Sequence, residues 1–88
     1  MCDATDVPAP MHGGVTVRFV NESGAVAVVY WRDSDGNLVE YSRLDADGFA
    51  DQETFETHEW VVQDEAGNVL LEYATSAAET QCILIEQP

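Results

Sequence analysis

The chain has 88 residues, enough for one domain, and 45% of them are hydrophobic and 9% aromatic, as in a globular protein. Its 17 acidic residues face only three arginines and no lysine, which gives a formal net charge of −14 at pH 7. Such a charge repels phosphate backbones and anionic lipids, so the sequence excludes nucleic acid and membranes as partners.

The first 14 residues lack both the basic region and the apolar core of a secretory signal. We interpret residues 1–14 as a flexible N-terminal tail and residues 15–88 as a single domain, and we expect a cytoplasmic protein.

The two cysteines permit one disulfide at most. Cys2 lies in the expected tail, whereas Cys82 lies in an apolar stretch near the C-terminus. The sequence therefore favours a buried Cys82 thiol over a disulfide bridge.

Short β-prone runs follow one another from residue 15 onward, separated by clusters of Gly, Asp, Asn and Ser. Residues 15–20 alternate apolar and polar side chains, which is typical of a half-buried strand. Residues 25–32 are almost wholly apolar, which suits a central strand covered on both faces. Five more strands are expected, at residues 38–44, 49–55 or 51–55, 59–64, 69–74 and 80–86. Together these runs predict an all-β protein, a seven-stranded antiparallel β-sandwich.

The familiar catalytic and metal-binding patterns are missing. Residues 33–37 look like a calcium loop, but Gly36 stands fourth where an EF-hand has its glycine sixth. No closely spaced pair of Cys or His suggests zinc, and no nucleophile-elbow motif accompanies His58. We therefore expect no enzyme activity, no metal and no cofactor.

A group of aromatic and hydrogen-bonding residues is the most distinctive feature of the sequence. Its members are Trp31, Tyr41, Thr54, His58 and Trp60. If residues 56–58 connect two paired strands, Phe55 lies opposite Glu59 and Thr54 opposite Trp60, and opposed residues share a face of the sheet. Two interpretations stay open at this point: the tryptophans are core residues, or they are walls of a binding pocket.

Several of these residues also carry a family resemblance. From residue 17 to residue 66 the chain resembles the β-domain of the von Hippel–Lindau family without a gap, and the last two strands resemble it more loosely. The residues that carry the resemblance are Phe19, Asn21, Ser23, Trp31, Asp35, Gly36, Tyr41, Leu44, His58, Trp60 and Asp64. The resemblance implies a prealbumin-like β-sandwich with a pocket that recognises hydroxyproline in an extended peptide.

The resemblance also implies a role for each pocket residue. Trp31 and Trp60 would form aromatic walls, with Trp60 as the floor, and the Tyr41 hydroxyl would bind the peptide backbone. Thr54, where the family has serine, and His58 would bond the hydroxyl of the modified proline. An unmodified proline would leave these two groups unpaired, at a cost of about 1–3 kcal/mol for each lost bond.

Two departures from the family limit what the resemblance implies. The chain shows no counterpart of the helical domain through which the family joins a ubiquitin ligase, so no adaptor function is expected. The expected pocket rim carries Ala50, Asp51, Glu53 and Glu56. An acidic rim favours a neutral or basic peptide containing proline or hydroxyproline.

Two alternatives of a different class remain. One is a structural or oligomerising sandwich that pairs through an edge strand and apolar positions such as Val26, Val28 and Ile83. The other is a small hydrolase or metal protein that uses His58 with Glu56 or Glu59.

Overall fold

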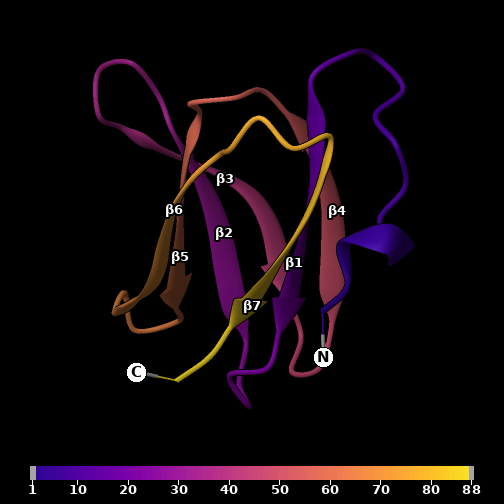
Figure 1. The fold of residues 1–88 in the computed structure, drawn as a ribbon. Coiled ribbons are helices and arrows are strands. Elements are labelled where there is room, and N and C mark those ends of the chain that lie inside the picture. The colour runs from indigo at the N-terminus through magenta and orange to yellow at the C-terminus, as the bar shows by residue number, and fades with distance from the viewer. Residues whose placement is uncertain (1, 88) are drawn as a thin grey trace.

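Seven strands in two sheets make up the computed structural model, which describes residues 2–87 (Figure 1). Met1 and Pro88, the outer ends of the predicted tail and domain, lie outside the described residues. The strands are β1 (Val15–Asn21), β2 (Ala27–Arg32), β3 (Leu38–Leu44), β4 (Phe49–Thr54), β5 (Glu59–Asp64), β6 (Val69–Ala74) and β7 (Thr80–Ile85), preceded by the short 3-10 helix η1 (Ala4–Asp6). Among the described residues, no helix has the length and apolar character needed to cross a membrane.

The two sheets have the strand orders β4-β1-β7 and β3-β2-β5-β6 and form a sandwich-like arrangement. Apolar side chains from both inner faces form the core, because residues two apart along a strand point to the same side. The ring of Phe19 on β1 meets that of Trp60 on β5, with centroids 5.7 Å apart. The buried core consists of Val15, Val17, Phe19, Ala27, Val29, Leu44, Trp60, Val62 and Ile85. The predicted all-β architecture of seven strands is thus confirmed, and each strand lies within two residues of its predicted bounds.

The pairing of β1 with β7 is parallel, with Thr16 beside Thr80 and Asn21 beside Ile85. The prediction of a wholly antiparallel sandwich is therefore wrong for this pair. Parallel neighbours need a long crossover connection. Here β2 to β6 supply it: β2 and β3 lie in the other sheet, β4 returns to this sheet, and β5 and β6 lie in the other sheet again before β7 pairs with β1.

The connection between β4 and β5 is not a hairpin, because these strands belong to different sheets. Val15 of β1 lies opposite Thr54, and Trp31 of β2 lies opposite Trp60. The predicted pairing of Thr54 with Trp60 is therefore wrong. The short connection instead crosses from one sheet to the other (Figure 1). It does so at the end of the sandwich where the β2–β3, β4–β5 and β6–β7 connections lie, which we call the open end. Both residues therefore still face the interior, from opposite layers.

Cys2 and Cys82 form a disulfide with a Cα–Cα distance of 5.6 Å, so the predicted free thiol at Cys82 is wrong. The bond forms because the segment before β1 packs against the three-stranded sheet, where η1 contacts β7. At the opposite edge of that sheet, the backbone N–H groups of Met11 and His12 donate hydrogen bonds to the Glu53 carboxylate of β4, at 3.1 and 3.2 Å. Residues 2–14, predicted as a tail, thus reach from β7 across to β4 (Figure 1).

Candidate functional site

All five side chains singled out in the sequence line a single cavity of about 200 Å³ at the open end of the sandwich. The complete lining is Trp31, Tyr41, Gln52, Glu53, Thr54, Phe55, His58 and Trp60. Pockets for drug-sized ligands usually enclose about 300–1,000 Å³, so this volume suits one side chain rather than a whole small molecule.

The cavity owes its aromatic walls to neighbouring strands of the four-stranded sheet. Trp31 lies directly beside Trp60 on β5 and beside Val39 on β3. Directly opposed residues share a face, which turns both tryptophans toward the interior. The two interpretations of the tryptophans are therefore compatible, since Trp60 packs on Phe19 in the core and also lines the cavity.

The rings meet mostly edge to face. Tyr41 and Trp60 have centroids 5.3 Å apart at 85°, and Trp31 and Tyr41 are 6.4 Å apart at 74°. Trp60 is only 2% exposed whereas Tyr41 is 50% exposed. Trp60 therefore forms the floor of the cavity and Tyr41 its rim, and such tilted arrangements are the favourable ones for aromatic rings.

The polar groups of the cavity are only partly satisfied by the protein. Thr54, which is buried, places its Oγ1 at 3.5 Å from Nδ1 of His58, at the outer limit of a hydrogen bond. Nε1 of Trp60 is buried and has no acceptor within residues 2–87. Since nearly all buried polar groups in folded proteins are paired, the long Thr54–His58 contact leaves hydrogen-bonding capacity in the cavity wall for another molecule.

Thr75, in the connection between β6 and β7, fixes the turn that carries His58. Its N–H and its Oγ1 donate to the carbonyl oxygen of His58 at 3.0 and 2.7 Å, and its own carbonyl accepts from Thr57 N–H at 2.9 Å. Thr57 has φ of 75°, a conformation that a β-branched residue rarely adopts. Thr75 could not be predicted from the sequence, because no local pattern connects it to His58, 17 residues away.

Gln52 and Phe55 line the pocket although they are not among the predicted pocket residues, and Glu53 is predicted only on the rim. Gln52 was within reach of pattern reasoning, since it shares a face of β4 with Thr54 by the two-residue period of a strand. Phe55 lies just beyond the end of β4, where its ring stands 5.6 Å from that of His58. No pattern in the sequence predicts that contact.

Two of the acidic residues predicted on the rim have partners within the protein. Asp51 accepts two hydrogen bonds from Arg18, at 2.7 and 3.1 Å, and this pairing raises the pKa of Arg18. Glu53 is held by the backbone N–H groups of the N-terminal segment, which carry no net charge. Of the residues predicted on the rim, Glu53 lines the cavity, whereas Ala50, Asp51 and Glu56 are not part of its lining.

Comparison of the sequence with protein-family models and with curated proteins finds no match. The geometry of the cavity and the residue-by-residue resemblance described above are therefore the grounds for a function.

Proposed function

We propose that this protein is a non-catalytic peptide-recognition module that binds a proline-containing segment through the cavity at the open end and prefers hydroxyproline. One observation carries the proposal. Side chains from β2, β3, β4, β5 and the β4–β5 turn meet around a cavity sized for one ring. The resemblance to the von Hippel–Lindau β-domain supports it, because these side chains are the ones that the resemblance assigns to a hydroxyproline pocket.

The chemistry of the cavity suits such a ligand. A proline ring is stiff and apolar on its faces, so the rings of Trp31, Tyr41 and Trp60 enclose it with little loss of conformational entropy. A ring hydroxyl both donates and accepts. Placed near the long Thr54–His58 contact of 3.5 Å, it would give both side chains a better partner than each offers the other.

The charge of the site determines which peptides it admits. With Glu53 in the wall and a formal net charge of −14, a neutral or basic peptide is favoured and an acidic one is repelled. The ligand that we propose is therefore a neutral to basic segment of a protein.

The proposal is tested by calorimetric titration with matched proline and hydroxyproline peptides. We expect the hydroxyproline form to bind about tenfold more tightly, since one buried bond to the hydroxyl is worth about 1–3 kcal/mol. Thr54→Val keeps the shape of the side chain but removes the hydroxyl, so the ratio should fall toward one. Trp31→Ala should weaken the binding of both peptides.

Thr16→Val is the matched control. Thr16 is also buried in a strand, at 2% exposure, but it lies outside the cavity lining. This variant should keep the full discrimination between the two peptides. Equal binding of both peptides to the unmodified protein would overturn the hydroxyproline preference, and no binding of either would overturn the whole proposal.

The alternative of an oligomerising sandwich has a direct test in sedimentation or size exclusion. Val28, one of the positions expected to pair, is 2% exposed and so offers little surface to a second copy. For the hydrolase alternative, the Glu59 carboxylate accepts a hydrogen bond from Arg32 at 2.9 Å. A concentration-dependent mass, or turnover in an activity screen, would favour one of these alternatives.

The compartment is also a proposal. The sequence predicts the cytoplasm, whereas disulfides persist mainly in oxidising compartments and in some hyperthermophiles. We propose that the protein works where the Cys2–Cys82 bond remains oxidised. Rapid thiol alkylation of lysed cells followed by mass spectrometry measures this, and alkylated Cys2 and Cys82 would contradict it.

A further inference from the structure

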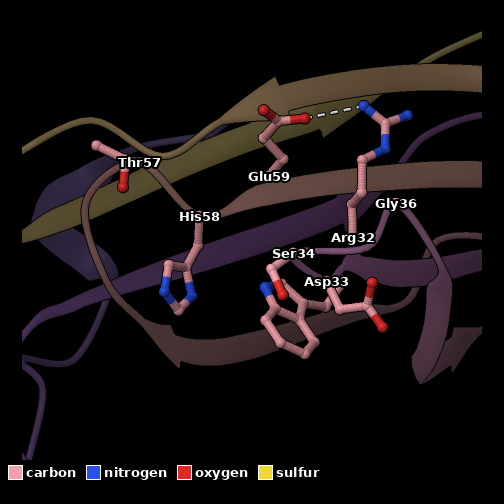
Figure 2. A pocket seen from close by; sticks show the side chains of 8 residues that line it. Arg32, Asp33, Ser34, Gly36, Thr57, His58 and Glu59 are labelled. Atoms are coloured by element: carbon pink, nitrogen blue, oxygen red, sulfur yellow. Dashed lines mark hydrogen bonds and ion pairs between the residues drawn. The ribbon is translucent and has the colours of Figure 1, made fainter.

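A second cavity, of about 430 Å³, adjoins the proposed proline pocket and shares two of its walls, Trp31 and His58. It lies between the β2–β3 turn and the β4–β5 turn. The full lining is Trp31, Arg32, Asp33, Ser34, Gly36, Thr57, His58 and Glu59. Figure 2 shows the joined side chains of Arg32 and Glu59 on one side of this space and His58 and Ser34 on the other.

The charge of the second cavity is negative despite its arginine. Arg32 donates to Glu59 and to Glu72, each at 2.9 Å, so its guanidinium is already shared between two carboxylates. These bonds, the one to Glu72 first, raise the pKa of Arg32. Asp33 adds a further carboxylate to the lining. A ligand group entering this space therefore meets more negative than positive charge.

A comparison of two similar turns shows that Asp33 has an oxygen to spare. Asp33 and Asp64 open turns of the same form, and in each turn the aspartate Oδ1 accepts two backbone N–H bonds at 2.8–2.9 Å. In the second turn the side chain of Asn68 also donates to Oδ2 of Asp64, at 2.9 Å. Asn37 makes no such bond, and within residues 2–87 no donor reaches Oδ2 of Asp33.

Trp31 and His58 line both cavities, so the two cavities are direct neighbours across these side chains. In an extended peptide, side chains two residues apart lie on the same side, about 6.6–6.8 Å from one another. A peptide whose proline fills the first cavity can therefore place the side chain two positions away in the second.

From these observations we infer that the second cavity is a subsite for a cationic side chain, lysine or arginine, two residues from the proline of the bound peptide. The inference rests on the proposed function. The aliphatic part of the side chain would lie against Trp31, and its charge would reach Oδ2 of Asp33 and the Glu59 carboxylate. An aromatic face and a carboxylate together are a favourable environment for a cation.

The subsite is tested with hydroxyproline peptides that carry lysine, norleucine or glutamate at one further position. That position is two residues before or two residues after the hydroxyproline. At one of these positions, lysine should bind about five- to tenfold more tightly than norleucine, which has the same stem without the charge. Glutamate should bind more weakly than either. Added salt should reduce the advantage of lysine and leave the preference for hydroxyproline over proline unchanged.

Asp33→Asn is the informative variant, because its amide oxygen retains the two turn bonds while the charge is lost. It should abolish the lysine advantage and preserve the hydroxyproline preference. Asp64→Asn makes the same change in the matching turn outside both cavities and should alter neither. Equal binding of lysine and norleucine at both positions, or a lysine advantage that survives Asp33→Asn, would overturn the subsite.

A probe without proline separates this inference from the proposed function. N-acetyl-lysine methylamide should shift the NMR signals of Trp31, Ser34 and Thr57 in the unmodified protein and not in Asp33→Asn, whereas the norleucine analogue should not shift them. If these shifts occur although hydroxyproline and proline peptides bind equally, the subsite stands and the hydroxyproline preference fails. If the shifts are absent although hydroxyproline is preferred, the subsite alone fails.

Discussion

Asn21 and Thr54 are both buried polar residues of the three-stranded sheet, but they lie at opposite ends of the sandwich and have opposite surroundings. Asn21 lies at the end where the β1–β2 and β3–β4 connections lie, which we call the closed end. Its side chain has hydrogen-bond partners for both its amide nitrogen and its oxygen. Its amide donates to the carbonyl oxygens of Ala25, Leu44 and Asp45 at 2.7, 3.3 and 3.0 Å, and its Oδ1 accepts from both the N–H and the hydroxyl of Ser23. Thr54, at the open end, has a single side-chain contact, which is long.

This difference distinguishes polar side chains that hold the fold together from polar side chains that can bind a ligand. At the closed end the amide ties the β1–β2 and β3–β4 connections together, so its hydrogen bonds are used up in holding the fold. At the open end, Thr54 has only the long contact to His58 and lines a cavity that a ligand can enter. Proteins commonly give up some stability to keep a binding site prepared. Variants at the closed end should thus reduce stability, and variants at the open end should reduce binding.

The largest expected effect is loss of the disulfide, which tests whether the open end depends on the N-terminal segment. The bond joins residues 80 positions apart, and the chain-entropy relation gives about 4.5 kcal/mol for a loop of this size. Urea unfolding of Cys2→Ser/Cys82→Ser should show this loss. Peptide affinity should change much less, because the strands still hold the cavity. A reductant should destabilise the unmodified protein and have no effect on the double variant.

Asn21→Ala should lower the free energy of unfolding by about 3 kcal/mol, because buried carbonyl groups lose their donor. The discrimination between hydroxyproline and proline should be unchanged in the molecules that remain folded. Chemical denaturation and calorimetry on the same sample measure the two quantities. Thr16→Val, which removes a buried hydroxyl that has no partner, should cost far less. A loss below about 1 kcal/mol in Asn21→Ala would show that the closed end does not depend on this amide.

The fold was accessible from the sequence wherever the signal is local. Alternation in β1 and the apolar run of β2 identify strands because burial on one face or both faces leaves a period. Sheet membership has no such signal. The turn at residues 56–58 is as short as a hairpin loop, and only the packing of Trp60 beside Trp31 shows that β5 belongs with β2. The Cys2–Cys82 bond likewise depends on where the two ends of the chain meet.

The site shows the same division. Trp31, Tyr41, Thr54, His58 and Trp60 were identified from their chemistry and spacing, and the structure brings all five together. The residues that hold or extend the site were not identified. Thr75 acts through hydrogen bonds to the main chain of another turn. The unbonded Oδ2 of Asp33 is recognised only by comparison with Oδ2 of Asp64, which accepts a bond from Asn68. Such features arise from three-dimensional geometry and leave no residue pattern.

Thr75→Val gives a smaller effect that joins stability and binding. It removes the 2.7 Å bond to the His58 carbonyl and keeps the backbone bond, so we expect a loss of about 1 kcal/mol. If Thr75 positions His58, the preference for hydroxyproline should fall as well, while proline binding stays the same. Thr75→Ser restores the hydroxyl and should restore the preference. A loss of stability with unchanged discrimination would show that Thr75 supports the fold alone.

The smallest effect concerns the pH dependence of the closed end. The side-chain bond from Asn68, followed by the backbone N–H of Asn68, lowers the pKa of Asp64 below its ordinary value. A group whose pKa is lowered on folding stabilises the protein above its unfolded-state pKa, and this contribution is lost as pH falls through the folded value. Asn68→Ala should raise the pKa of Asp64 in an NMR titration and lower the stability above that pKa, so stability should fall by less during acidification. Asn37→Ala is the control, because it removes no side-chain bond to Asp33 and should leave the dependence of stability on acid pH unchanged. If Asn37→Ala changed this dependence as much as Asn68→Ala does, the two turns would not differ in this way.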